Sequence, residues 1–204
     1  MHKKEEVLEH LSAIKSVLVD KDSFFPYNYN ALIIWGLIGT IMTFSMPYLM
    51  KHSVIEGTLF SIVMMSIGFF IEGLLTKRVN ENYDIETCTK KQRFIASSFT
   101  ILATFAIVFS AFFAKQDLIV PLFMVWMFTC GFGHYVVGYV LNMRLFTVMG
   151  YISLVSALIL FIVSIFIIDL GDINSLFFYI CQVITFVVLG ILPIWMGRKL
   201  KKEL

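Results

Sequence analysis

Charged residues are scarce in this 204-residue sequence: they make up 15% of it, whereas 59% of the residues are hydrophobic. Soluble domains contain about a quarter charged residues, so a soluble fold could not cover this much apolar surface. The few charges also lie in short segments between long apolar runs. This segregation is typical of a protein that crosses a lipid bilayer several times.

Cysteines are few, and recognisable catalytic motifs are absent. The three cysteines, Cys88, Cys130 and Cys181, are an odd number, which argues against a disulfide framework. The sequence has no GxxxxGK[ST] loop, GxSxG elbow, GxGxxG turn, HExxH pair or CxxC pair. We therefore expect no enzymatic activity, no cofactor and no bound metal. We expect no nucleic acid partner either, because the basic residues flank apolar runs and the net charge is only +2.

Six apolar runs are long enough to form transmembrane helices, because a hydrocarbon core of about 30 Å needs about 20 helical residues. The expected spans are residues 31–50, 54–75, 94–114, 118–141, 145–168 and 175–197. Their continuous apolarity lacks the period-two alternation of barrel strands. The sequence predicts an all-α fold with two parts. A cytoplasmic segment, residues 1–26, precedes a polytopic membrane helix bundle, residues 27–204, with six transmembrane helices in three hairpins.

Lysine and arginine are distributed unevenly over the segments between these spans. Fourteen of the 16 lie before the first span, between the second and third, after the fourth, or after the sixth. Only Lys51 and Lys115 fall on the opposite side. Cytoplasmic loops carry the excess of basic residues, so we expect a plasma (inner) membrane protein with both termini in the cytoplasm.

Residues 4–20 have the pattern of an amphipathic helix. Its apolar face is formed by Val7, Leu11, Ile14 and Leu18. Lysine and arginine do not dominate the polar face, as they do in helices that lie on anionic lipid. We expect this helix to bind a protein partner or a second copy of itself, or to pack against the cytoplasmic ends of the bundle.

The segment of residues 76–93 is the longest expected connection between spans, and it carries charges of both signs. Surface connections often carry binding residues. The segment is therefore a second expected contact surface for a cytosolic partner, or else a solvated connector.

Two ionisable side chains fall inside expected spans, Glu72 in the second and His134 in the fourth. Such residues are rare in lipid and are functional candidates by default. The two side chains can meet if these spans are neighbours, and together they would carry protons or sense pH. Alternatively, Glu72 reaches the interface beside Lys77 and His134 bonds to a neighbouring helix. A transport path would also use Tyr135, Tyr139, Gln182, Thr40, Thr43, Ser97, Ser98 and Thr100.

Soft metal ligands recur along two of the spans, namely Met42, Met46 and Met50 in the first and Met127, Cys130 and His134 in the fourth. These side chains suit Cu(I). Methionine also fills gaps in ordinary helix packing, and we expect that role here.

Two functions are consistent with these patterns. The sequence favours a non-enzymatic membrane subunit or regulator, which binds a partner through the N-terminal helix and residues 76–93. The alternative is a transporter or channel for a small solute or an ion, with or without proton coupling, built around Glu72 and His134.

Overall fold

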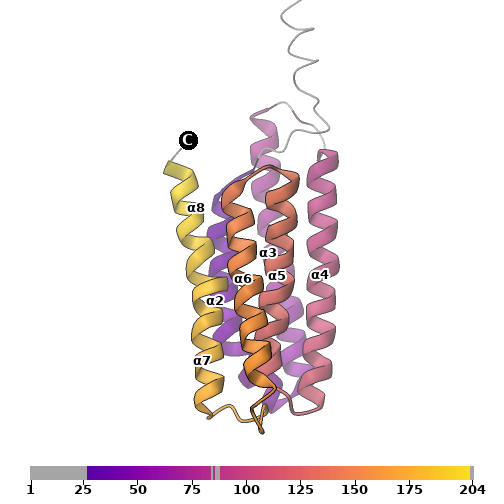
Figure 1. Cartoon of the computed structure of the whole chain (residues 1–204). Coiled ribbons are helices and arrows are strands. Elements are labelled where there is room, and N and C mark those ends of the chain that lie inside the picture. Colours follow the sequence, from indigo (N-terminus) through magenta and orange to yellow (C-terminus); the bar gives the residue numbers. More distant parts are fainter. Residues whose placement is uncertain (1–26, 84, 86–87, 203–204) are drawn as a thin grey trace, which may run out of the picture.

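Six long helices dominate the computed structural model, which describes residues 27–83, 85 and 88–202 (Figure 1). They are α2 (Asn30–His52), α3 (Val54–Glu81), α4 (Lys90–Lys115), α5 (Val120–Val140), α6 (Arg144–Ser164) and a last helix in three parts, α7 (Leu176–Thr185), η1 (Phe186–Ile191) and α8 (Leu192–Lys202). Each is long and apolar enough to span a membrane, and the described residues form no strand. The expected all-α fold with six such helices is confirmed.

The charged residues separate toward the two ends of the bundle. One end holds the end of α3, the start of α4, the turn between α5 and α6, and the end of α8 (Figure 1). The basic residues described at this end are Lys77, Arg78, Lys90, Lys91, Arg93, Arg144, Arg198, Lys199, Lys201 and Lys202. Lys51 and Lys115 lie at the opposite end. The chain therefore has one strongly basic end, which we call the basic end.

The order of packing differs from three hairpins. The most extensive helix interface joins α5 to α6, whereas α6 has little contact with the last helix. The last helix packs instead against α2, which brings the first and last described helices together (Figure 1). The expected arrangement in three hairpins is therefore not confirmed. A tight turn holds α5 beside α6. Residues 165–175 form a longer link, so α7 begins beside α5 and α2 instead of α6.

The connection between α3 and α4 is shorter than expected, because α3 continues to Glu81 and α4 begins at Lys90. The expected bounds of 76–93 are therefore wrong, and the connection is residues 82–89. Thr89 caps α4: its hydroxyl accepts a hydrogen bond from the Gln92 N–H (3.2 Å), while Gln92 Oε1 accepts one from the Thr89 N–H (3.0 Å). Gln92 also exchanges two side-chain amide hydrogen bonds with Asn80 (2.8 and 3.1 Å). These polar contacts extend both helices beyond the apolar runs.

α2 approaches the last helix closely through two glycines. A Cβ atom on Gly39 would lie 2.4 Å from the carbonyl oxygen of Leu189, and one on Gly36 would lie 2.6 Å from that of Gly190. Small residues allow such close backbone approach in membrane bundles. The contact falls on η1, a π-helical stretch. Stretches of this kind are rare and often lie at functional sites.

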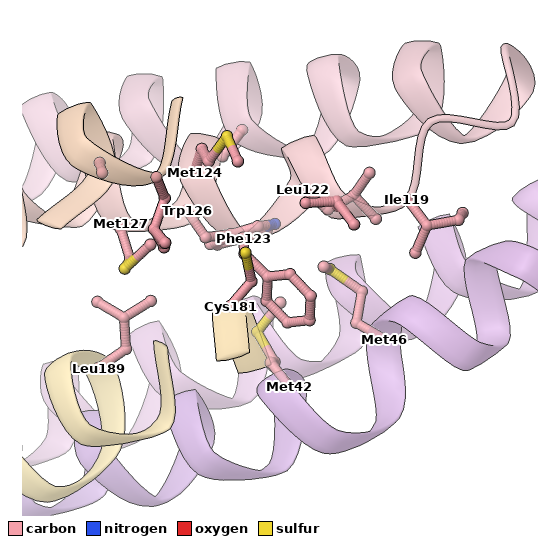
Figure 2. Packing of buried hydrophobic residues seen from close by; sticks show 14 of the residues in the cluster. Met42, Met46, Ile119, Leu122, Phe123, Met124, Trp126, Met127, Cys181 and Leu189 are labelled. Atoms are coloured by element: carbon pink, nitrogen blue, oxygen red, sulfur yellow. The ribbon is translucent and has the colours of Figure 1, made fainter. Parts of the chain in front are cut away.

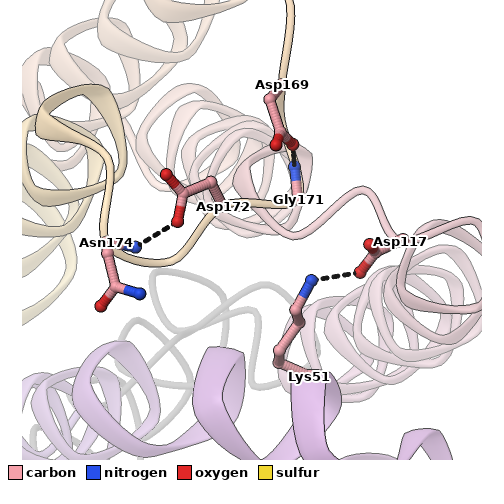
Figure 3. A network of polar contacts seen from close by, with 6 residues as sticks. All are labelled: Lys51, Asp117, Asp169, Gly171, Asp172 and Asn174. Atoms are coloured by element: carbon pink, nitrogen blue, oxygen red, sulfur yellow. Dashed lines mark hydrogen bonds and ion pairs between the residues drawn. The ribbon is translucent and has the colours of Figure 1, made fainter.

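The link of residues 165–175 closes the end of the bundle opposite the basic end. The carbonyl oxygen of Leu170 accepts hydrogen bonds from the N–H groups of Ile119 (3.0 Å) and Val120 (2.9 Å) at the start of α5. Figure 3 shows the polar contacts around this link, which join Lys51 to Asp117, the Gly171 N–H to Asp169, and the Asn174 N–H to Asp172. The link is thus tied to α5, and a second contact ties α2 to the α4–α5 turn.

Candidate functional site

The helices surround a cavity of about 110 Å³. Its wall comes from α2, α3, α4, α5, α6 and the last helix, and most of the wall is apolar. The cavity extends from Tyr27, just before α2, to Met46 and Phe123 farther along the bundle. Figure 2 shows the packed core that adjoins this far part, with Phe123 facing Met42 and Met46. An apolar pocket with a few polar groups, set between helices, is the usual form of a small-molecule site.

Glu72 is one of the polar groups on this wall. Its Oε2 accepts a hydrogen bond of 2.8 Å from the indole Nε1–H of Trp35 on α2. The Trp35 ring in turn packs edge-on against Phe69, with the ring centroids 5.2 Å apart. The carboxylate therefore faces the interior of the bundle, and its described hydrogen bond is to α2.

Tyr27 lies close to Glu72 at the basic end of the cavity. Burial raises the pKa of the Tyr27 phenol well above its usual range, and the nearby charges of Glu72 and Tyr29 raise this pKa further. The phenol therefore stays neutral at physiological pH. It adds a hydroxyl to the wall without adding charge.

His134 of α5 lines the same cavity as Glu72, as the sequence suggested. Its imidazole lies between the rings of Phe99 and Phe146, at centroid distances of 5.9 and 6.1 Å. The backbone of Cys130 is its hydrogen-bonding partner. Among residues 27–202, none of the described hydrogen bonds or ion pairs joins His134 to Glu72. The two residues thus share a cavity without direct pairing.

Thr185, at the end of α7, is a wall residue that the sequence analysis missed. The residue is 2% exposed and lines the cavity. Its hydroxyl has no hydrogen-bond partner, whereas every other buried side-chain oxygen or nitrogen in the described part of the chain has one. By contrast, the hydroxyl of Thr43 on the same wall donates to the carbonyl oxygen of Gly39 (2.7 Å). An unpaired buried hydroxyl costs about 1–3 kcal/mol. A ligand in the cavity would remove this cost.

The other expected polar residues do not meet at this cavity. Gln182 is buried, and its Nε2 donates to the carbonyl oxygen of Thr43 (3.2 Å), so it links α7 to α2. Tyr135 packs against Tyr151, with ring centroids 5.2 Å apart, and Tyr139 is 78% exposed. Of the expected hydroxyl residues, Ser97 and Thr100 are exposed and donate to carbonyl groups of their own helix. These residues do not line the cavity, whereas Thr43, another expected member of the path, does. Their role in a transport path stays a prediction.

The soft ligands are only partly brought together. Met42, Met46, Cys130 and His134 line the cavity, whereas Met50 and Met127 are fully buried in the core. Within the described residues, no three His, Cys, Asp or Glu side chains are placed to hold a metal ion. All four methionines belong to the packed core, where Figure 2 shows Met42, Met46 and Met127.

The expected partner-binding helix, with Val7, Leu11, Ile14 and Leu18, lies outside the residues that the structure describes. Its binding role stays a prediction. The second expected contact surface includes the connection between α3 and α4. The structure describes this connection at residues 82, 83, 85, 88 and 89.

No family model matches this chain, and no curated protein or solved structure is significantly similar to it. No relative therefore suggests a substrate, a partner or a role for any residue. The cavity and the charges at the two ends are the features of the described residues that bear on function.

Proposed function

We propose that this chain is a multi-pass plasma membrane protein that binds a small solute in the cavity of its helix bundle and carries it across the bilayer. The observation that carries the proposal is the cavity wall, where a mostly apolar surface includes the buried, unpaired hydroxyl of Thr185. This arrangement costs stability in the absence of a ligand, because both a void and an unpaired hydroxyl are unfavourable. A bound solute repays both costs.

Two further features support a binding role for this cavity. Glu72 places a carboxyl group on the wall, and ionisable groups inside spans are costly and generally functional. The π-helical stretch Phe186–Ile191 begins directly after Thr185 and contributes Leu189 to the wall. An irregular helix beside the site lets that wall deform more easily than a regular one. The partner-binding alternative has no comparable feature in the described residues.

The transport proposal can be tested by solute entry into liposomes. We expect liposomes that contain the protein to take up at least one of urea, glycerol, guanidinium chloride and tetramethylammonium chloride faster than protein-free liposomes do. Stopped-flow light scattering measures the rates. Thr185→Phe should abolish the increase, because the ring would occupy the cavity. Thr104→Phe is the matched control, since Thr104 is exposed on α4 and should leave the rates unchanged. Rates equal to those of protein-free liposomes for every solute would contradict transport.

The basic end sets the proposed orientation, because the positive-inside rule places it in the cytoplasm. Cys88 offers a direct test, since it is exposed in the connection at this end, while Cys130 is partly buried and Cys181 is buried. A membrane-impermeant maleimide should label the protein only after the cells are permeabilised. Gln116→Cys in a Cys88→Ala background should instead be labelled in intact cells, because Gln116 is exposed at the opposite end. Labelling of Cys88 in intact cells would reverse the orientation.

A further inference from the structure

We propose that the solute of this cavity is a small lipophilic cation, of the alkylammonium class, held by the Glu72 carboxylate within a surround of aromatic rings. This inference rests on the proposed solute-binding function and adds the chemical class of the solute.

The charge on the cavity wall is negative when Glu72 is ionised. Glu72 is the acidic residue among the described residues that line the cavity, and none of these residues is a lysine or an arginine. The two described ion pairs, Lys51–Asp117 and His52–Glu56, lie at the end opposite the basic end. The hydrogen bond that Glu72 accepts from Trp35 comes from an uncharged indole. The lining therefore offers the carboxylate no compensating positive charge from a lysine or an arginine. A buried carboxyl group needs a cationic partner to stay charged, and the lining provides none, so the ligand that completes the charged site is a cation.

The cavity wall is rich in aromatic rings. The rings that line it are those of Tyr27, Trp35, Phe99, Phe123, Trp126 and Phe146. Aromatic faces attract cations, and aromatic cages are the usual receptors of alkylated ammonium groups. The same rings exclude a small hydrated metal cation, because they cannot replace its water ligands. The wall therefore favours an ammonium group that carries apolar substituents.

The size of the cavity limits the size of the ligand. The cavity, at about 110 Å³, is smaller than the cavity of about 150 Å³ that accommodates benzene in a soluble protein. The ligand is therefore no larger than a single ring. Thr185 adds a neutral hydroxyl to the wall from the last helix, while Glu72 belongs to α3. A hydroxyl can accept a hydrogen bond from an ammonium N–H, so this wall residue is compatible with a cationic ligand.

The titratable groups that face this ligand are Glu72, Tyr27, Cys130 and His134. Tyr27 and Cys130 are neutral in their protonated forms, and a neutral imidazole at His134 leaves the wall with the single negative charge of Glu72. A protonated His134 would instead favour an anion. Charge selectivity is therefore the measurement that decides the inference.

The two tryptophans on the wall provide the readout. The chain has three tryptophans, and the third, Trp195, is 53% exposed on α8. In a Trp195→Phe background, emission comes only from Trp35 and Trp126, both of which line the cavity. The protein in lipid nanodiscs is titrated with tert-butylammonium, with tert-butanol as a neutral compound of the same shape, and with pivalate as the anion.

We expect tert-butylammonium to change the tryptophan emission saturably, with tert-butanol binding at least about tenfold more weakly. Glu72→Gln should reduce this preference to near equality, because the amide keeps an acceptor for the Trp35 N–H but carries no charge. Glu56→Gln is the matched control: it removes an exposed carboxylate from the same helix and should leave binding unchanged. If Glu72→Gln fails to fold, the three compounds can still be compared on the protein that keeps Glu72.

Three other results of the titration would change the assignment of the cavity. Equal binding of tert-butanol and tert-butylammonium would overturn the cation inference and leave solute binding intact. Preference for pivalate would assign the cavity to anions and would place the charge on His134. No saturable response to any of the three compounds would contradict both the cation class and the solute-binding function of the cavity.

Discussion

Gly39→Ala should lower the free energy of unfolding by about 1–3 kcal/mol, the usual range for overpacking in a well-packed interior. The added Cβ would lie 2.4 Å from the Leu189 carbonyl oxygen, and a backbone atom cannot turn aside as a side chain can. The last helix would have to move away from α2. Because Leu189 lines the cavity, ligand binding should weaken as well.

Gly73→Ala is the matched control for this substitution. A Cβ atom at Gly73 of α3 would have no neighbouring atom within 4 Å. Alanine has the higher helix propensity, so this variant should be neutral or slightly more stable. Unfolding in mixed micelles with increasing dodecyl sulfate, followed by circular dichroism, measures both variants. Equal stability of Gly39→Ala and the wild-type protein would show that the α2 contact is looser than the structure indicates.

Phe123→Ala should cost about 2 kcal/mol of unfolding free energy and should enlarge the cavity. Phe123 is 1% exposed, packs against Phe178 at a centroid distance of 5.3 Å, and forms part of the cavity wall. In lipid or detergent the unfolded helices stay in apolar surroundings, so most of the cost comes from lost packing contacts rather than from water exposure. The same unfolding titration measures this cost.

Phe70→Ala is the control for this second substitution, because Phe70 is 68% exposed on the outside of α3. It removes the same ring and should change stability little. The enlarged cavity of Phe123→Ala should also admit a bulkier alkylammonium ion than the wild-type protein does, which the tryptophan titration can show. A Phe123→Ala protein as stable as Phe70→Ala would mean that the surrounding helices close the space.

The six spans could be predicted from the sequence because the length of an apolar run is a one-dimensional property. The ends of the helices were less accurate, since polar residues extend them. α3 continues to Glu81 because Asn80 bonds to Gln92 at the start of the neighbouring helix α4. The sequence does contain a signal for the start of α4: threonine three residues before glutamine is the pattern of a capping box. That signal would have shortened the expected connection.

The order of packing could not be predicted, because helices in lipid are apolar on every side. In soluble proteins the apolar face shows where a helix packs, whereas in membranes lipid and protein contacts use similar residues. Gly39 and Gly73 have the same residue type in the same kind of span, yet only Gly39 lies against another backbone. Glycine alone therefore did not reveal that α2 packs on the last helix.

The candidate site could be predicted only in part, because only some of its residues are unusual in an apolar run. Glu72 and His134 stand out because an ionisable residue in an apolar run is rare. Thr185 does not stand out, because threonine in a span usually bonds to its own helix, as Thr43 and Thr129 do here. Only the three-dimensional contacts show that its hydroxyl is unpaired.

The π-helical stretch Phe186–Ile191 limits how the gene for this chain can change. A π turn holds one more residue than an α turn between equivalent hydrogen-bonding groups. Loss of one codon here would let the last span close into a regular α-helix, and α8 would keep the face that packs against α2. Loss of one codon elsewhere in the last span would instead rotate everything after the deletion by about 100° around the helix axis. Among functional descendants of this gene, single-residue deletions in the last span will therefore fall within residues 186–191.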